Sequence, residues 1–406
     1  MSSSMFPLVR LARVARRVPP IKSVSSCSIG LESVESWSGR LIEESLEPAD
    51  SEGAEFEQGD ILFGKLRPYL AKVWVADRPG TYIGDFIRLR PFRDCDPEFL
   101  GYVLRSREVI EAASAESLGT KMPRTEWERL RQLQVPAPPL EVQHQVVDYL
   151  DRETAEIDAF IADLDDYSTL LSHRLDAERD RIFLALLDSS NPVPLKRWLK
   201  IPLSYGATAA ANHFDPGEVR YLRITDFGAE GDLRPEVATS LPYEAAAGYM
   251  TAPGDILLAR SGATVGKAFM VPDSLPEACF AGYLVRARCQ NRVEASFVWH
   301  ALQTTKYKDW IAANATVATI QNVSAQKFGT YRIPRPSLAK QSEVIEELDR
   351  VQKNIDASQA LSAEARTLAV ERRAALISAA VTGQIDVTAQ GVSAAEQLRD
   401  DLEAHL

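Results

Sequence analysis

The chain has 406 residues, 45% of them apolar, so it is long enough for two or three domains with packed cores. Its formal net charge of −11 argues against a nucleic-acid partner unless basic residues gather locally. It has no run of about 18 apolar residues that could span a membrane, and its four irregularly spaced cysteines form neither a disulfide framework nor a C-x-x-C zinc site, which favours a cytoplasmic protein.

The segment before Glu32 contains basic residues and no acidic residue, a composition that also occurs in mitochondrial presequences. Residues 6–11 (FPLVRL) nevertheless resemble residues 193–198 (VPLKRW) in the middle of the chain. Because this similarity places the segment in an internal repeat, we expect residues 6–17 to begin a folded domain and not to be a cleaved peptide.

Short apolar runs between turn-forming residues predict β-strands before residue 135. The clearest runs are residues 61–63 (ILF), 73–75 (VWV) and 86–89 (FIRL). A similar run at residues 221–224 (YLRI) predicts a strand in the second half of the chain. Both regions are also rich in Gly, Pro and aromatic residues, which is typical of globular domains with many turns.

A long helix follows the first of these regions. Residues 140–187 contain neither Gly nor Pro, and their apolar residues alternate in steps of three and four, as in a coiled-coil seam. At about 1.5 Å per residue, an unbroken helix of this length measures roughly 70 Å. Acidic residues outnumber basic ones by thirteen to four between residues 136 and 190, so this segment carries most of the negative charge.

The chain consists of two copies of one unit. Residues 135–140 (VPAPPL) recur as residues 333–338 (IPRPSL), and residues 59–62 (GDIL) recur as residues 254–257. A second helix is predicted from residue 338 to 381, with Leu361, Ala365 and Leu368 among the residues on its apolar side. Since the two helices have matching length, we expect them to pack against each other; two unrelated surface helices are the less favoured alternative.

This order predicts an α+β fold: two globular domains of mixed strands and helices, separated by two long helices. The expected segments are a first globular domain at 1–139, a first helix at 140–190, a second globular domain at 191–337, a second helix at 338–387 and a tail of no assigned role at 388–406.

No catalytic centre is apparent in the sequence. Residues 261–268 (SGATVGKA) resemble a phosphate-binding loop, but only three residues separate the glycines and Ala268 stands where Ser or Thr is required, so we expect a tight turn bearing a basic residue. The chain has no G-x-S-x-G or H-E-x-x-H motif, and its five histidines are scattered. Residues 191–194 (NPVP) lack the aromatic residue that an adenine-methyltransferase loop needs to stack a flipped base.

The remaining signal is for binding. The globular regions carry basic residues interleaved with aromatic ones, and polar residues precede each Pro-rich turn. Arg and Lys read guanine edges, Asn and Gln read adenine edges, and all of them hold phosphates. The candidate DNA-binding residues are Lys65, Arg67, Lys72, Lys121 and Arg124 in the first region, and Arg260, Ser261, Lys267, Thr319, Gln321 and Asn322 in the second.

These landmarks, in their duplicated order, resemble the specificity subunit of type I restriction-modification enzymes. The residues that carry the resemblance are the two GDIL segments, residues 260–267 (RSGATVGK) and the two Pro-rich turns, each followed by a long helix. Residues 376–385 (LISAAVTGQI) are similar to the closing motif of that family, so that the resemblance covers residues 6–387.

The resemblance implies a non-catalytic chain that binds double-stranded DNA. Each globular region would be a target-recognition domain for one half of a split sequence, and the helices would form an antiparallel spacer. Two methyltransferase subunits would dock on the spacer and methylate adenine with S-adenosylmethionine. Restriction subunits would supply ATP-driven translocation and cleavage, with ATP and magnesium. This chain would itself hold no cofactor or metal and would have no membrane partner.

The sequence departs from the family pattern in two places. Residues 64–68 (GKLRP) stand where the second copy has an Arg-Ser-Gly turn, and the glutamate of the usual Glu-Gln pair after each Pro-rich turn is replaced by Val142 and Lys340. A different class of function also stays open, a coiled-coil scaffold whose globular repeats bind proteins.

Overall fold

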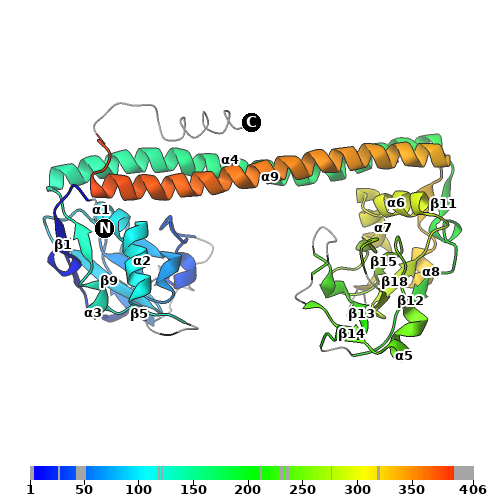
Figure 1. Ribbon diagram of the computed structural model, residues 1–406, viewed down its shortest axis with the longest axis horizontal. Helices are drawn as coiled ribbons and strands as arrows, with labels where there is room; N and C mark the ends of the chain where they lie inside the picture. The colour runs from blue at the N-terminus through cyan, green and yellow to red at the C-terminus, as the bar shows by residue number, and fades with distance from the viewer. Residues whose placement is uncertain are drawn as a thin grey trace. The chain divides into compact units, whose positions relative to one another are not determined.

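The computed structural model describes residues 4–25, 28–42, 52–117, 119, 122–210, 213–228, 233–234, 237–275, 277–317 and 321–387. The chain divides into two compact units. Unit 1 comprises Met1–Asp166 and Ser362–Leu406, and unit 2 comprises Tyr167–Leu361. Each unit contains a globular part and one stretch of each of two long helices (Figure 1).

The globular part of unit 1 is built on two four-stranded sheets. The first has the strand order β2-β9-β6-β7 and the second the order β3-β5-β8-β4, while β1 and β10 form a separate antiparallel pair. The strands are β1 (Leu8–Arg10), β2 (Ala15–Arg17), β3 (Lys22–Val24), β4 (Ser28–Ile29), β5 (Glu52–Phe56), β6 (Ile61–Gly64), β7 (Val73–Val75), β8 (Gly80–Tyr82), β9 (Phe86–Pro91) and β10 (Gln134–Pro136).

Helices join the first sheet to the long helices in unit 1. Asp96 caps the first of them, because its side chain accepts a hydrogen bond from the Phe99 N–H at 2.9 Å, and Pro97 occupies the first turn. One core joins residues of the sheet, of these helices and of the long helices, among them Leu89, Leu104, Leu150 and Leu376. The helices are α1 (Pro97–Arg105), α2 (Arg107–Ala115) and α3 (Trp127–Leu130).

Unit 2 repeats this plan. Its main sheet has the order β12-β18-β15-β16, a smaller sheet has the order β14-β13-β17, and β11 pairs with β21 as β1 pairs with β10. The strands are β11 (Pro192–Pro194), β12 (Ser204–Tyr205), β13 (Val219–Leu222), β14 (Ser240–Leu241), β15 (Ile256–Ala259), β16 (Ala268–Met270), β17 (Ala278–Phe280), β18 (Leu284–Ala287), β19 (Thr316–Val317), β20 (Gln321–Asn322) and β21 (Arg332–Pro334), and the helices are α5 (Tyr243–Ala246), α6 (Arg292–Ala301), α7 (Thr305–Asn314) and α8 (Ala325–Phe328).

The predicted α+β class and most of the predicted elements are confirmed. The runs at 61–63, 73–75 and 86–89 form β6, β7 and β9. The run at 221–224 lies only partly in β13, which ends at Leu222. The long helices are α4 (Leu140–Ser189) and α9 (Leu338–Thr382), each beginning at the end of its Pro-rich turn. Residues 6–17 contain β1 and all of β2, so they belong to a folded domain as expected.

The long helices run antiparallel in both units (Figure 1). In unit 1, Arg373 donates from Nε to Asp158 at 2.9 Å, and Arg366 does so to Asp165 at the same distance. In unit 2, Arg181 pairs with Glu347 at 2.8 Å. Because the partner number falls as the α4 number rises in unit 1, the helices pack with opposite directions there.

The apolar side of α9 differs from the prediction in one stretch. Leu361 and Leu368 are 50% and 41% exposed, whereas Ala365 is buried as predicted and Ala369, outside the predicted set, is buried too. Leu361 and Leu368 lie four and three residues from Ala365, so periodicity alone could not exclude them. The small alanine side chains allow close packing at these positions.

The N-terminal residues contact the end of α9 within unit 1. The Met5 N–H donates to the Thr382 carbonyl at 2.8 Å. Gly383 has a φ of +75° that favours glycine, and a Cβ atom there would lie 2.9 Å from the Phe6 ring. The apolar length needed to cross a bilayer is not reached by any helix in the described part of the chain.

Candidate nucleic-acid interface

The duplicated Gly-Asp pair is a structural device of both units. Gly59 and Gly254 have φ values of +82° and +81°, which glycine adopts without steric cost. The carboxylate of Asp60 accepts from the Glu57 N–H at 2.8 Å, and that of Asp255 accepts from the Ala252 N–H at the same distance. Each aspartate therefore closes the turn that leads into β6 or β15.

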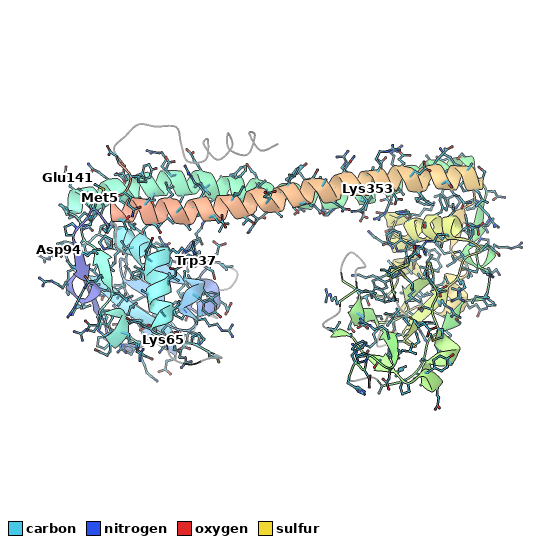
Figure 2. All side chains as sticks on the ribbon, in the orientation of Figure 1. Met5, Trp37, Lys65, Asp94, Glu141 and Lys353 are labelled. Atoms are coloured by element: carbon cyan, nitrogen blue, oxygen red, sulfur yellow. The ribbon has the colours of Figure 1, made fainter. Side chains whose placement is uncertain are left out.

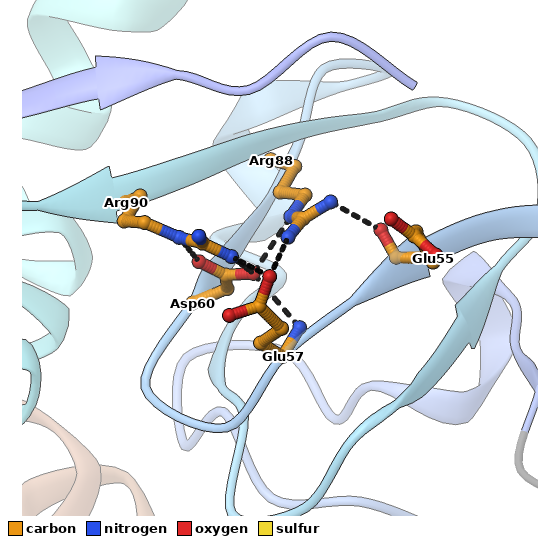
Figure 3. A network of polar contacts seen from close by, with 5 residues as sticks. All are labelled: Glu55, Glu57, Asp60, Arg88 and Arg90. Atoms are coloured by element: carbon orange, nitrogen blue, oxygen red, sulfur yellow. Dashed lines mark hydrogen bonds and ion pairs between the residues drawn. The ribbon is translucent and has the colours of Figure 1, made fainter. Parts of the chain in front are cut away.

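Both aspartates are buried and bind arginines of the neighbouring strand. Asp60 accepts hydrogen bonds from Arg88 and Arg90, and Figure 3 shows this network together with Glu57 and the Glu55 carbonyl. Burial raises the pKa of Asp60. Hydrogen bonds from Arg90, the Glu57 backbone and Arg88 together lower the pKa by more than burial raises it, so that the pKa of Asp60 lies below its ordinary value.

Asp255 repeats this arrangement, with Arg288 donating from Nε and Nη2 at 2.7 Å each. In both units the Gly-Asp motif thus links the two central strands of the main sheet, and its carboxylate is occupied inside the fold.

The loops that follow β6 and β15 have the same backbone geometry but different sequences. Arg67 and Ala71 have φ values of +50° and +48°, and Gly262 and Gly266 have φ values of +85° and +89° at the equivalent positions. The Gly64 N–H donates to the Lys72 carbonyl at 2.8 Å, as the Ala259 N–H does to the Lys267 carbonyl. The departure of the first copy from an Arg-Ser-Gly turn therefore leaves the backbone fold of the turn intact.

Three chain segments meet at the first residue of this loop in each unit. In unit 1 the Lys65 N–H donates to the Asp85 carbonyl at 2.8 Å, and the Lys65 carbonyl accepts from the Thr125 N–H at 2.9 Å. Leu66 and Arg124 form a β-bridge beside these bonds.

Unit 2 makes the same set of contacts. The Arg260 N–H donates to the Tyr283 carbonyl at 3.0 Å, its carbonyl accepts from the Val323 N–H at 2.9 Å, and Ser261 bridges to Asn322. We name Lys65, Asp85 and Arg124 the unit 1 cluster, and Arg260, Tyr283 and Asn322 the unit 2 cluster.

The unit 1 cluster is a group of three charges, of which Lys65 and Asp85 are half-buried and Arg124 is exposed. Arg124 donates from Nη2 to Asp85 at 2.7 Å, and the Lys65 ammonium lies 3.5 Å from the other Asp85 oxygen. The Arg124 side chain is 49% exposed, and the exposed Arg67 lies in the same loop. Figure 2 shows Lys65 on the globular part of unit 1, away from Glu141 at the start of α4.

The unit 2 cluster has one cation and no carboxylate. The Arg260 guanidinium lies over the Tyr205 ring, 4.5 Å from its centroid, and Nε donates to the Asn322 side-chain oxygen at 3.4 Å. Tyr205 is fixed in turn, because its hydroxyl accepts from the Ala325 N–H at 3.0 Å. Tyr283 is 69% exposed beside them.

The other candidates occupy varied places. Lys72 is held inside unit 1, since its ammonium donates to the Leu31 carbonyl at 2.8 Å and its side chain is only 13% exposed. Lys267, its equivalent, is exposed and lines a cavity of about 810 Å³ within unit 2. The turn of residues 261–268 leads into β16 and not into a helix, which confirms that it is a tight turn. Lys121 and Thr319 lie outside the described residues, and the side chain of Gln321 is likewise not described.

Sequence reasoning missed Asp85, Tyr283 and Tyr205. Basic residues and amides stand out in the sequence as DNA-binding candidates, whereas an aspartate and two tyrosines do not. Asp85 and Tyr283 are separated by 198 positions, which is the repeat offset, so a position-by-position alignment of the two copies is the signal that could have paired them.

The glutamines of the Pro-rich turns are structural. Gln143 donates from Nε2 to the Pro138 carbonyl at 2.8 Å and accepts from the Asp96 N–H at 2.8 Å, so it ties the turn to the start of α1. Gln341 donates to the Pro336 carbonyl at 3.0 Å. Lys340, which replaces the glutamate, pairs with Glu343 on the exposed side of α9.

Within the described ranges, no group of three or more His, Cys, Asp or Glu side chains has the arrangement of a metal site. The buried His300 is held inside unit 2, where its Nδ1 accepts from Arg179 Nε at 3.3 Å. Burial and the nearby Arg179 lower the pKa of His300 to about 3, so it stays neutral near pH 7.

Comparison with known proteins places this architecture in a family. The family model of the type I restriction modification DNA specificity domain matches residues 43–162 and 206–366, which together exceed half of the chain. The specificity subunit of the type I restriction enzyme EcoDI from Escherichia coli is 28% identical over 134 residues, which cover 32% of this chain and 29% of that protein. The StySPI specificity subunit from Salmonella potsdam is 28% identical over 137 residues, covering 33% of this chain and 29% of that protein.

The matched segments thus span less than a third of the length of these curated relatives. A solved structure described as "Structural basis underlying complex assembly and conformational transition of the type I R-M system" has a TM-score of 0.65 at 19% identity, and covers 94% of this chain and 98% of its own. That likeness concerns the fold. With two matched domains, one in each copy of the repeat, the chain belongs to the family of type I restriction-modification specificity subunits.

Proposed function

We propose that this chain gives a type I restriction-modification complex its DNA sequence specificity by reading a bipartite target. One observation carries the proposal: the two units present different polar side chains on the same backbone frame. The backbone hydrogen bonds of Lys65 recur at Arg260, but the side chains of the cluster change from Lys, Asp and Arg to Arg, Tyr and Asn. Reading two different half-sequences with two copies of one fold requires this combination.

The charge distribution supports the same function. Phosphate contacts need local positive charge, and both clusters supply it on a chain whose total charge is −11. Acidic residues concentrate in α4, which suits α4 to protein partners better than to phosphates.

The proposed division of labour follows the repeat. Residues 1–139 and 191–337 act as target-recognition domains, and residues 140–190 and 338–387 act as spacer helices on which two methyltransferase subunits dock. Those subunits methylate adenine with S-adenosylmethionine, and restriction subunits use ATP and magnesium for translocation and cleavage. The chain itself supplies the DNA sequence specificity, works in the cytoplasm and catalyses no reaction.

Mapping of methylated adenine across a genome tests this function. The chain is produced together with its methyltransferase subunits in a host that lacks other adenine methylation, and a second culture lacks only this chain. We expect a bipartite methylated motif in the first culture and its absence in the second. Identical methylation in both cultures would contradict the function, and DNA binding without a steep salt dependence would favour the protein-binding scaffold.

A further inference from the structure

Some arginines of the unit 2 globular part pair with a carboxylate, as Arg288 does with Asp255 at 2.7 Å. Others do not; Arg286, for example, donates to the Met250 carbonyl at 2.7 Å. Among the described residues, Arg260 has no carboxylate partner and contacts a tyrosine ring and an amide oxygen instead. The arginines paired with carboxylates are Arg220, Arg223, Arg288, Arg292 and Arg335.

These contacts fix the guanidinium without neutralising it. The ring of Tyr205 covers one face, and the Asn322 oxygen accepts the Nε hydrogen at 3.4 Å. Tyr205 cannot rotate freely, because its hydroxyl accepts the Ala325 N–H. The two terminal nitrogens can therefore donate hydrogen bonds from the edge of the guanidinium that faces away from Nε. A fixed fork of two N–H donors with full positive charge matches two adjacent acceptors of a ligand.

Guanine offers such a pair, O6 and N7, in the major groove. A DNA phosphate also offers two acceptors, but phosphates are the same in both halves of any target. A phosphate contact therefore gives no reason for all three cluster positions to change between the units while the backbone frame stays constant. A base contact explains the change of side chains, because the two halves of the target differ in base sequence.

We propose that Arg260 reads a guanine in one half of the target, and that Tyr205 and Asn322 are positioning residues that hold its guanidinium in the reading orientation. This inference rests on the DNA-reading function proposed above and specifies which base one unit reads. The unit 1 cluster, with Lys65 and Arg124 arranged around Asp85, reads its own half independently.

The test is a methylated-motif map for variants of the full chain, produced with its methyltransferase subunits. In R260A one G·C position in one half of the motif loses its preference, by roughly 5- to 150-fold, while the other half is unchanged. In R260K the same position weakens although the positive charge remains, because an ammonium group lacks the two-pronged fork. In Tyr205→Leu that position also weakens, but less than in R260A.

A matched control is Arg292→Ala, which removes an arginine of the same unit that is 44% exposed and pairs with Asp273. We expect its motif to be that of the unchanged chain. If R260A methylates no DNA, R260K decides by the same criterion, since lysine keeps the charge and can pack its stem on the Tyr205 ring.

The outcomes separate the two levels of the proposal. If the unchanged chain directs no bipartite motif, the DNA-reading function itself is wrong. If it does and R260A and R260K keep every position of that motif, Arg260 does not read a base. If methylation falls evenly at all sites with no position relaxed, Arg260 contacts a phosphate, which also overturns the inference.

Discussion

Arg67 and Gly262 occupy the same position of the duplicated turn, with φ values of +50° and +85°. The left-handed region is accessible to glycine at no steric cost, whereas for other residues it costs about 1–2 kcal/mol. Unit 1 holds Arg67 in this conformation through a 2.7 Å hydrogen bond from its N–H to the Pro123 carbonyl. Strained backbone of this kind is common at functional sites, and here it keeps a basic side chain exposed in the loop of the unit 1 cluster.

Arg67→Gly is expected to stabilise unit 1 by up to about 1 kcal/mol, because relief of strain exceeds the entropy that glycine adds to the unfolded chain. Arg67→Ala is the matched control, since it removes the same side chain but keeps the Cβ atom. Urea unfolding of the two variants measures the difference. Equal stability of the glycine and alanine variants would show that Arg67 is not strained.

Residue identity was partly predictable from the sequence. The repeat pointed to the loops at 64–68 and 260–267 because their flanking motifs recur. It could not show that Asp60 and Asp255 are buried ion-pair partners, since their arginines lie about 30 residues downstream and pair only through strand contacts. Nor could it show that Tyr205 supports Arg260, which depends on the folded loop.

At the scale of elements, the antiparallel helices of unit 1 are joined by ion pairs one heptad apart. Asp158 and Arg373 are only 14% and 12% exposed, and Arg40 of the globular part also reaches Asp158 at 2.5 Å. Asp165 and Arg366 form the next pair along and are 56% and 50% exposed. The same chemistry is therefore present in two environments.

Asp158→Ala is expected to destabilise unit 1 by about 3 kcal/mol, because it leaves the Arg373 guanidinium, which is only 12% exposed, without its carboxylate. Asp165→Ala, the matched control, is expected to cost less than about 1 kcal/mol, since water screens the exposed pair. Chemical denaturation of both variants gives the comparison. A similar small effect of the two substitutions would mean that Asp158 does not anchor the globular part to the helices.

The helices themselves were predictable because 48 residues without Gly or Pro leave few alternatives to a helix. Which residues the helices bury against each other was less predictable. Of the predicted residues Leu361, Ala365 and Leu368, only Ala365 is buried, and Ala369 is buried beside it. Hydrophobicity favours the leucines, and only the partner helix decides in favour of small side chains.

For the molecule as a whole, the duplication is the feature from which function follows. Both units place the strands of the main sheet in the same order. In both, a strand pair, β1 with β10 or β11 with β21, leads through a Pro-rich turn into a long helix. The internal offset of 198 residues revealed this duplication before any fold was known. The make-up of each cluster could not be predicted, because its residues come from loops that meet only in the folded domain.

The central proposal is that the two long helices set the gap between the two half-sequences of the DNA target. Deleting one heptad from each helix, residues 163–169 of α4 and 359–365 of α9, tests it and keeps the seam in phase. Seven residues correspond to about 10 Å of helix, or at most about three base pairs of DNA. Mapping of methylated adenine is predicted to show both half-sequences unchanged with a shorter gap between them; unchanged half-sequences with an unchanged gap would contradict the account.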